Sequence, residues 1–440
     1  MRHKVDLPNY GPFDEKRVFT AGPMPEPIVW RGIKLGVPVC EDIWKPGVCA
    51  HLKKHGAEIF IAPNGSPYEH KKDNVRAEIV SDRARENGVP MTYHNQVGGQ
   101  DELVFDGGLL VANADGQIVG RTAYWREAVS LVEFVRGKKV WEIASAPQET
   151  DDQGVASIYA ALVMGLRDYI EKNRFPGVVL GMSGGVDSAL CAALAADAIG
   201  ADRVRCVMMP SPYTSRDSLE DAEECAKALG CSYESINIGP AMGAYEQMLG
   251  GAKGITAENI QSRARGVTLM AISNTTGLMV LSTGNKSEMS VGYATLYGDM
   301  CGGFSGIKDV YKTTVYALCQ WRNRHMLGWG KGPAGVVIPE RILTKAPSAE
   351  LRPDQKDQDS LPSYNDLDGI LKGLVERELG VEELMAEGYE RATILKVWKL
   401  LDRAEYKRRQ SAPGVKITPR SFGKDRRYPI TNGFTDVVTS

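Results

Sequence analysis

A turn rich in glycine and serine constrains this chain more than any other stretch of its sequence. The turn is Gly181-Met182-Ser183-Gly184-Gly185-Val186-Asp187-Ser188, and it lies between a short apolar run at residues 177–180 and an alanine-rich run at residues 189–196. The apolar run is typical of a buried parallel strand, and the alanine-rich run favours a helix. Such a turn exposes backbone N–H groups at a helix N-terminus, where adjacent glycines let an anion approach closely. The turn therefore predicts a phosphate site.

Strand and helix patterns continue to alternate on the C-terminal side of this turn. Strands are predicted at residues 204–209, 233–238 and 278–281, and a helix is predicted at residues 217–229. This alternation implies a doubly wound parallel sheet. Residues 345–368 are rich in Pro, Ser, Asp and Gln, so we expect a long loop or lid there.

In the first part of the chain, strand patterns also alternate with helix patterns, which indicates a layered α/β domain. A polar stretch at residues 145–154 contains Pro147 and three acids, and we expect it to be a linker. The chain is thus expected to hold one domain at residues 1–144 and a second at residues 155–440. In the first domain the pattern predicts strands at residues 36–40, 58–62 and 91–95, a hairpin at 109–119, and helices at 46–55 and 72–87.

Composition excludes several classes of function. The 440 residues carry a net charge of −2, which gives no reason to expect a nucleic acid as partner. No apolar run approaches the length of about eighteen residues that a membrane helix needs, and the first residues lack the apolar core of a signal peptide. Eight cysteines are scattered without a Cys-x-x-Cys pair, which argues against a zinc site or a disulfide scaffold. These features predict a cytoplasmic protein that binds no membrane.

Three segments resemble known families. Ser183-Gly184-Gly185-Val186-Asp187-Ser188 resembles the pyrophosphate loop of the ATP pyrophosphatases, which cleave ATP between its α and β phosphates. Residues 281–288 (Leu-Ser-Thr-Gly-Asn-Lys-Ser-Glu) and 292–299 (Gly-Tyr-Ala-Thr-Leu-Tyr-Gly-Asp) resemble the glutamine-dependent NAD synthetases, and the resemblance extends over nearly the whole chain. It implies a ligase that converts deamido-NAD (nicotinic acid adenine dinucleotide) to NAD through an adenylate. Glutamine or ammonia would supply the nitrogen, and AMP and pyrophosphate would be released.

The resemblance also implies the fold. It predicts an incomplete nitrilase-like layered α/β domain, missing its start, at residues 1–144. It predicts a doubly wound parallel-sheet ATP-pyrophosphatase domain, of the adenine nucleotide alpha hydrolase type, at residues 155–440. Domains of the nitrilase type associate face to face, so we also expect a homo-oligomer.

By the same resemblance the second domain binds ATP, deamido-NAD and Mg²⁺. A carboxylate must be adenylated before ammonia can attack it, which calls for an anchor for pyrophosphate and a cation on the phosphates. The predicted Mg²⁺ ligands are Asp187 and Glu288, although position alone would make Glu288 a helix N-terminal acid. The predicted ATP contacts are Gly181, Met182, Ser183, Gly184, Gly185, Val186, Asp187, Ser188, Thr283, Lys312 and Ser348. The predicted deamido-NAD contacts are Asn259, Arg263, Glu288 and Lys407.

Residues 39–44 (Val-Cys-Glu-Asp-Ile-Trp) resemble the nucleophile segment of nitrilases. A cysteine on a sharp turn at a strand end is exposed and held rigidly, so its thiolate can attack the amide carbon of glutamine and release ammonia. Cys40 is therefore the predicted nucleophile, and Lys4 matches the lysine that stabilises the oxyanion. The positions that hold glutamine in the family match Tyr10, Ser66 and Lys72.

One departure from the family concerns the third member of the nitrilase triad, a glutamate that lies well upstream of the lysine. Here the lysine is Lys4, and no later acid fits the family's pattern. From the sequence we expect a misassigned start, a gene fragment or an inactive glutaminase half. Ammonia is accordingly expected to be the nitrogen source rather than glutamine.

Three alternatives share some of these features. Another pyrophosphate-loop amidotransferase or ligase, making GMP or asparagine, would have the same loop but not the nitrilase-type cysteine segment. A tRNA-thiolating relative would need a pair of reactive cysteines and a basic RNA surface, which a net charge of −2 does not favour. The N-terminal half could also be a non-catalytic oligomerisation module.

Overall fold

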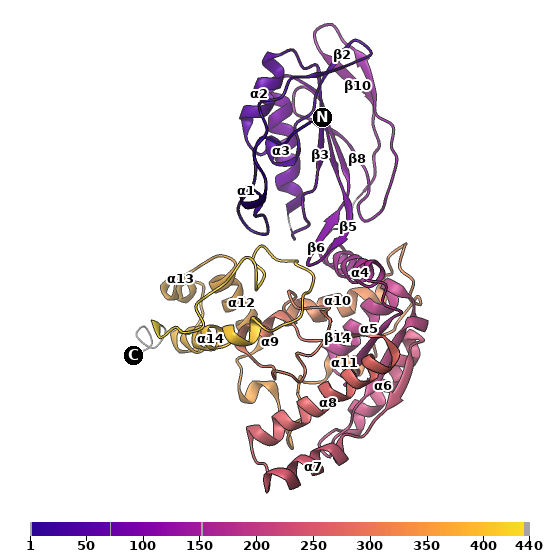
Figure 1. Cartoon of the computed structure of the whole chain (residues 1–440), viewed down its shortest axis with the longest axis vertical. Coiled ribbons are helices and arrows are strands. Elements are labelled where there is room, and N and C mark those ends of the chain that lie inside the picture. Colours follow the sequence, from indigo (N-terminus) through magenta and orange to yellow (C-terminus); the bar gives the residue numbers. More distant parts are fainter. Residues whose placement is uncertain (1, 71, 151–152, 435–440) are drawn as a thin grey trace. The chain divides into compact units, whose positions relative to one another are not determined.

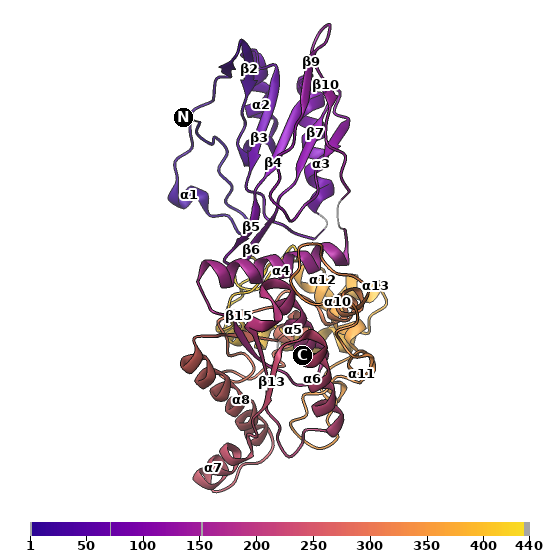
Figure 2. The ribbon, with the colours of Figure 1, turned by 90° about the vertical axis from the view of Figure 1, so that its right-hand side faces the viewer.

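The computed structural model describes residues 2–70, 72–150 and 153–434 and divides into two compact units (Figures 1 and 2). Unit 1 contains Met1–Gly99 and Leu103–Ser157, and unit 2 contains Gln100–Glu102 and Ile158–Ser440. The domain boundaries expected from the sequence stay a prediction. Residues 151–152 of the expected linker and residues 435–440 of the expected second domain lie outside the described residues.

Unit 1 is built on a mixed six-stranded sheet in the order β1-β2-β3-β4-β7-β8. The two central pairings, β2 with β3 and β3 with β4, are parallel, and the remaining pairings are antiparallel. The strands are β1 Ile28–Trp30, β2 Ile33–Gly36, β3 Ile59–Asn64, β4 Met91–Asn95, β7 Leu109–Ala112 and β8 Ile118–Arg121. Two separate ribbons pair β5 Val97–Gln100 with β6 Leu103–Asp106, and β9 Glu133–Arg136 with β10 Trp141–Ser145.

Two helices of unit 1 lie side by side and bury their apolar sides against this sheet (Figure 1). They are α2 Pro46–Lys54 and α3 Lys72–Asn87, and the shared core includes Leu52, Phe60 and Met91. The shorter elements are α1 Glu15–Val18 and the 3₁₀ helix η1 Cys40–Ile43. The strand predicted at residues 36–40 is wrong, because β2 ends at Gly36 and η1 begins at Cys40. Pro38 lies between them, and a proline cannot donate a ladder hydrogen bond.

Unit 2 contains a five-stranded parallel sheet in the order β13-β12-β11-β14-β15. The strands are β11 Val178–Gly181, β12 Val204–Met208, β13 Ser232–Ser235, β14 Met279–Ser282 and β15 Phe304–Ser305. The chain builds outward from β11 to β13 and then returns to β14 on the other side of β11. The order therefore reverses between β11 and β14, and doubly wound sheets bind their ligands at the carboxyl ends of strands at such a reversal. The doubly wound parallel sheet predicted from the sequence is confirmed.

Helices connect these strands and continue into a C-terminal helical group. The helix α5 is buried almost throughout, as its alanine-rich sequence permits. Helices α12 and α14 pack together, and their shared buried core includes Leu367, Leu371 and Val397. The helices that begin after residue 153 are α4 Val155–Lys172, α5 Val186–Ile199, η2 Ala201–Arg203, α6 Arg216–Leu229, α7 Gly239–Leu249, α8 Ile255–Thr276, α9 Lys286–Val291, α10 Lys312–Arg324, α11 Glu340–Thr344, η3 Asp357–Asp359, α12 Tyr364–Val375, α13 Val381–Ala386, α14 Arg391–Arg403 and α15 Glu405–Arg408.

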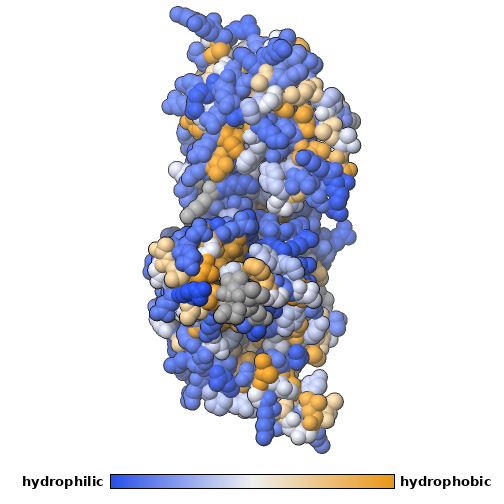
Figure 3. Space-filling view, turned by 90° about the vertical axis from the view of Figure 1, so that its left-hand side faces the viewer, coloured by the Kyte–Doolittle hydropathy of each residue, from blue (hydrophilic) through white to orange (hydrophobic). Residues whose placement is uncertain are grey.

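The surface is mostly hydrophilic, with hydrophobic residues in small separate groups on the face that Figure 3 shows. The edge strand β1 is an apolar exception, since Ile28, Val29 and Trp30 are all exposed. Within the described ranges, no helix combines the length and the apolar character that a crossing of a lipid bilayer requires.

A buried ion pair inside unit 2 should make that unit sensitive to the loss of either partner. Arg322 and Asp197 are both 0 % exposed, and the guanidinium donates from Nε and Nη2 to the two carboxylate oxygens at 2.6 and 2.9 Å. The Tyr159 hydroxyl donates to the same carboxylate at 2.6 Å. Replacing Asp197 with Asn should lower the free energy of unfolding of unit 2 by about 3–5 kcal/mol, because it leaves a buried guanidinium without its counter-charge.

Urea denaturation of the full chain measures this effect, and a matched variant controls for the loss of a carboxylate. Glu223 pairs with Lys227 on the exposed side of α6 at 2.6 Å, where an ion pair contributes little. Glu223→Gln should therefore change the free energy of unfolding by less than about 0.5 kcal/mol. Equal effects of Asp197→Asn and Glu223→Gln would contradict a structural role of the buried pair.

Candidate active sites

The predicted phosphate loop of unit 2 joins β11 to α5 at the reversal point of the sheet. Its shape is held by its own hydroxyls: Ser188 Oγ accepts from the Ser183 N–H at 3.2 Å, and Ser183 Oγ accepts from the Gly185 N–H at 3.3 Å. Gly185 is the N-cap of α5 and offers no side-chain cap. The first N–H groups of α5 are therefore left without a side-chain cap, and together with the helix dipole they favour the binding of an anion at the helix N-terminus.

Gly184 is required at its position in this loop. Its φ of +74° lies in the left-handed region, and a Cβ there would lie 2.3 Å from the Ser218 carbonyl oxygen. The loop thus packs against the first turn of α6, and any larger residue would push it away from that helix.

Two carboxylates and one lysine meet beside the loop. Asp187 lies in the first turn of α5 and Glu288 in the first turn of α9, and the Nζ of Lys312, at the start of α10, contacts both. The Lys312 Nζ to Glu288 Oε1 distance is 3.4 Å, and the contact with Asp187 is closer. Asn285 completes the group by donating from Nδ2 to Asp187 Oδ1 at 2.9 Å. Thr283 follows directly at the end of β14 and is partly buried.

The charges of Asp187, Glu288 and Lys312 interact, which shifts the pKa values of Glu288 and Lys312. Burial, and then the negative charge of Asp187, raises the pKa of Glu288 to about 8, although the Lys312 ammonium opposes the shift. Burial alone would lower the pKa of Lys312, but Asp187 and Glu288 outweigh it and raise that pKa. Glu288 also caps α9, since its carboxylate accepts from the Asn285 N–H at 3.3 Å. The simple role of a helix N-terminal acid is therefore present together with the contact to Lys312.

Three of the predicted deamido-NAD contacts gather around residues 292–297, which follow directly after the helix α9 that carries Glu288. Lys407 Nζ donates to the carbonyl oxygens of Gly292 and Ala294 at 2.8 and 2.6 Å. Asn259 accepts from the Thr295 hydroxyl at 3.0 Å. Arg263 donates to the Leu296 carbonyl at 3.2 Å from an exposed position on α8. Asn259, Arg263 and Lys407 thus contact this second motif, whereas the Glu288 side chain contacts Lys312 beside the phosphate loop.

Ser348 lies in the predicted lid, which the structure shows as a loop over most of residues 345–363. Its side chain is exposed and donates to the Gln355 carbonyl at 2.6 Å. Glu350, two residues later, ties this loop to the first turn of α6 by accepting from the hydroxyls of Ser215 and Ser218 at 2.8 and 2.7 Å. Because Ser218 packs against Gly184, the loop that carries Ser348 lies close to the phosphate loop.

In unit 1, Cys40 occupies the sharp turn that the sequence predicts. Its φ is +49°, which is rare for a residue other than glycine, and it begins η1 close after β2. Burial raises the pKa of the Cys40 thiol above its usual value. The Gly65 N–H and the Lys4 ammonium oppose this rise, and Glu41 and Glu15 add to it.

The N-terminal segment is held against Cys40 by a buried carboxylate. Asp42 Oδ1 accepts from the backbone N–H groups of Val5 and Asp6 at 3.0 and 2.8 Å, and its Oδ2 accepts from the Val39 N–H at 2.9 Å. Lys4 is thereby brought near the thiol, and its Nζ also lies 2.8 Å from both carboxylate oxygens of Glu15. Glu15 is not among the residues predicted from the sequence.

The three predicted glutamine contacts have different surroundings. Tyr10 is exposed and donates its hydroxyl to Glu41 at 2.9 Å. The Lys72 ammonium lies 5.7 Å from the centre of the Trp44 ring, which directly follows η1. Ser66 is buried, and its hydroxyl accepts from Arg76 Nε at 3.2 Å. Tyr10 and Lys72 thus lie near the Cys40 turn, whereas the Ser66 side chain is engaged inside the protein.

Comparison with known proteins decides the family. A family model described as NAD synthase matches residues 158–411, and one described as Carbon-nitrogen hydrolase matches residues 1–138. The glutamine-dependent NAD(+) synthetases of Rhodobacter capsulatus and Acinetobacter baylyi are 48 % and 46 % identical to this chain, over 98 % of it and 79 % of each relative. The chain belongs to the glutamine-dependent NAD(+) synthetases. The structure of the Acinetobacter baumannii glutamine-dependent NAD(+) synthetase in complex with ADP matches it with a TM-score of 0.73 and 44 % identity, over 98 % of this chain and 78 % of that one.

The nitrilase-like domain and the synthetase domain predicted from the sequence are confirmed. The alternatives that make GMP, asparagine or thiolated tRNA do not fit a glutamine-dependent NAD(+) synthetase. Sequence reasoning missed Asn285, Glu350 and Glu15. Asn285 could have been found, because an asparagine three residues before a glutamate predicts a helix cap at the strand end where ligands bind. Nothing in the local pattern around Glu350 or Glu15 indicates the residues that they contact.

Proposed function

We propose that this chain catalyses the ATP-dependent amidation of deamido-NAD to NAD in unit 2, with AMP and pyrophosphate as the other products. Ammonia supplies the nitrogen, either free or released from glutamine at Cys40. The observation that carries the proposal is the group of Asp187, Glu288 and Lys312 beside an uncapped helix N-terminus at the reversal of a parallel sheet.

The first step joins the substrate carboxylate to AMP. A carboxylate oxygen of the nicotinate group attacks the α-phosphorus of ATP, the bond from that phosphorus to the bridging oxygen breaks, and pyrophosphate leaves. The N–H groups in the first turn of α5, at residues 186–188, and the Lys312 ammonium are suited to the departing negative charge. The acyl adenylate that forms has a good leaving group, which the free carboxylate lacks.

The second step uses the nitrogen. Ammonia attacks the carbonyl carbon of the adenylate, AMP leaves, and the attacking nitrogen loses a proton to give the amide. Asn259, Arg263 and Lys407 surround residues 292–297, so we assign them to the deamido-NAD that presents this carbonyl. Ser348 and Thr283 are assigned to ATP on the same basis of position.

Mg²⁺ fits the carboxylate pair. Two carboxylates that share the contact to Lys312 offer the oxygen ligands that this cation prefers. Burial, and then the charge of Asp187, raises the pKa of Glu288, so a divalent cation at the pair would be favoured. Asp187 and Glu288 would hold it. When bound, Mg²⁺ supplies positive charge to the phosphate oxygens.

Release of ammonia from glutamine is assigned to Cys40 in unit 1. The thiolate would attack the amide carbon to form a thioester, with Lys4 stabilising the oxyanion and Tyr10, Ser66 and Lys72 holding the substrate. Free ammonia is the source that the residues support better, since burial disfavours the thiolate and the Lys4 charge is shared with Glu15. A homo-oligomeric state and a cytoplasmic location stay proposals that rest on the sequence.

The purified chain is expected to form NAD from deamido-NAD with ATP, Mg²⁺ and ammonium, releasing one AMP and one pyrophosphate per NAD. Coupling to an NAD-specific dehydrogenase measures NAD, and chromatography measures AMP. Nicotinic acid mononucleotide and xanthosine monophosphate serve as competing substrates. The first carries a carboxylate, as deamido-NAD does, and the second carries a carbonyl oxygen on its purine ring that an amino group can replace. Higher kcat/KM with either of them than with deamido-NAD would show that the assigned substrate is wrong.

A further inference from the structure

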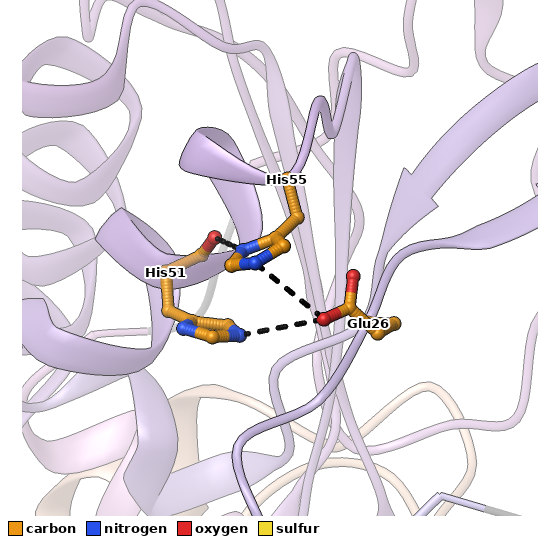
Figure 4. Close-up of side chains that lie close together, drawn as sticks. All are labelled: Glu26, His51 and His55. Carbon is orange, nitrogen blue, oxygen red and sulfur yellow. Dashed lines mark hydrogen bonds and ion pairs between the residues drawn. The ribbon is translucent and has the colours of Figure 1, made fainter.

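Two histidines and a glutamate gather on unit 1 in an arrangement that neither half-reaction uses (Figure 4). Glu26 precedes β1, and His51 and His55 lie in the last turn and at the C-cap of α2. Glu26 Oε1 lies 3.9 Å from His51 Nε2 and 3.6 Å from His55 Nε2. One ligand atom from each residue lies within 4.8 Å of the others, and this is the one such group of three potential ligands among residues 2–70, 72–150 and 153–434.

The helix places both imidazoles on one side. Residues four apart are neighbours on a helix surface, and the ring centres of His51 and His55 are 4.1 Å apart. His55 Nδ1 lies 2.8 Å from the His51 carbonyl oxygen, which requires a proton on Nδ1. The lone pair of His55 is thereby assigned to Nε2, the atom nearest Glu26, which is how backbone carbonyls orient metal-binding imidazoles.

His51 has an unsatisfied nitrogen at the same place. Its Nε2 is buried and has no hydrogen-bond partner among the described residues, with Glu26 Oε1 too distant at 3.9 Å. A buried polar atom without a partner costs free energy, and a ligand that accepts its lone pair removes that cost. The position also favours a cation, because the C-terminal end of a helix carries negative partial charge.

The carboxylate comes from a restrained segment. Glu26 stands between Pro25 and Pro27, and a residue that precedes proline is restricted to extended conformations. Arg2 further fixes this backbone by donating to the Glu26 carbonyl at 3.0 Å. The Glu26 side chain itself is 68 % exposed, so the carboxylate can shift toward the imidazoles.

We propose that Glu26, His51 and His55 bind a divalent transition-metal ion, with Zn²⁺ as the best fit. Two imidazole nitrogens and one carboxylate oxygen suit Zn²⁺ and its first-row neighbours, whereas Mg²⁺ and Ca²⁺ prefer oxygen ligands alone. Ligands at about 2.0–2.1 Å in tetrahedral geometry are separated by roughly 3.3 Å. The two carboxylate–imidazole distances, 3.9 and 3.6 Å, therefore need to shorten by only about half an ångström or less, and the two imidazole nitrogens lie within 4.8 Å of each other and would also move closer. A water molecule would fill the fourth position.

Zinc binding at this site would join the segment before β1 to α2. The metal ion would then link the two elements at the edge of the sheet where β1 pairs with β2. The lack of a Cys-x-x-Cys pair argued against zinc, but that criterion does not test a His-x-x-x-His pair, whose partner carboxylate lies 25 residues upstream of His51.

Equilibrium titration with Zn²⁺ in competition with a chromophoric chelator tests the proposal on the metal-free, reduced full chain. We expect one tight site, a Co²⁺ absorption spectrum of tetrahedral type, and an increase in the thermal midpoint of unit 1. His51→Gln and His55→Gln should each weaken Zn²⁺ binding by at least about tenfold to a hundredfold, since even loss of a group that only orients a ligand has that effect. Glu26→Gln should weaken it as well without disturbing packing, because the side chain is exposed.

His325→Gln is the matched control. His325 also follows a helix and places Nδ1 3.1 Å from the carbonyl four residues earlier, but its ring stacks on Trp321. This variant should bind Zn²⁺ as the parent chain does, and so should Cys40→Ala, which removes the half-buried thiol of unit 1. Absence of a tight site in the parent chain would overturn the proposal. So would unchanged affinity in both His51→Gln and His55→Gln, or loss of the site in Cys40→Ala.

Discussion

Replacing Asp187 with Asn, or Glu288 with Gln, is expected to lower the rate of ammonium-driven NAD synthesis by about a hundredfold or more, as loss of a preorganised electrostatic contact does. Both changes keep the shape of the side chain and remove its ability to carry a negative charge. Lys312 then loses one of its two carboxylate partners, and the proposed Mg²⁺ loses a ligand. The measurement is AMP release in the presence of deamido-NAD, ATP, Mg²⁺ and ammonium.

The metal assignment adds a second readout. Each variant should need a higher Mg²⁺ concentration for half of its maximal rate, which a purely structural defect would not produce. Glu382→Gln is a suitable control, because Glu382 is an exposed first-turn acid of a helix, α13, in the same unit. Its rate and Mg²⁺ dependence should equal those of the parent chain. AMP release that is unchanged in both site variants would show that these carboxylates do not hold the cation.

The inner part of the parallel sheet could be predicted because its strands are continuous apolar runs, as strands buried on both faces are. β11, β12 and β14 begin and end within one residue of the predicted runs. The same criterion failed at residues 36–40, where Pro38 interrupts the run and the chain turns into η1. The search for continuous apolar runs could not detect β15, because that strand has only two residues and is defined by its pairing with β14.

The phosphate loop was also predictable, since the glycine that it needs at residue 184 and the helix that follows are local features of the sequence. The group around it is not local. Asn285 and Lys312 reach Asp187 across 98 and 125 residues, and no periodicity encodes such contacts. Resemblance to a family supplied Lys312 and Glu288, but it could not supply Glu350 or the burial of Ser66, which depend on how neighbouring loops pack.

Replacing Cys40 with Ala should abolish glutamine-driven NAD synthesis and leave ammonium-driven synthesis unchanged. The thiol is the group assigned to release ammonia from glutamine, whereas free ammonia reaches the adenylate without it. In the parent chain glutamine should be the weaker nitrogen source at neutral pH. A thiol of ordinary pKa, about 8.5, is only a few per cent thiolate at pH 7, and burial raises the pKa of Cys40 further and so lowers that fraction.

The raised pKa of Cys40 can be tested by a pH-dependent measurement that does not require NAD synthesis in unit 2. Because the thiolate is the reactive form and the pKa of Cys40 is raised, alkylation of Cys40 by iodoacetamide should be slow at pH 7 and should still accelerate above pH 9. Mass spectrometry of the Cys40 peptide measures the rate. Fast alkylation at pH 7, together with glutamine supporting NAD synthesis as well as ammonium does, would show that the thiol is activated and that the preference for ammonia is wrong. If Cys40→Ala retained glutamine-driven synthesis, a different nucleophile would have to release the ammonia, and the assignment of Cys40 itself would fail.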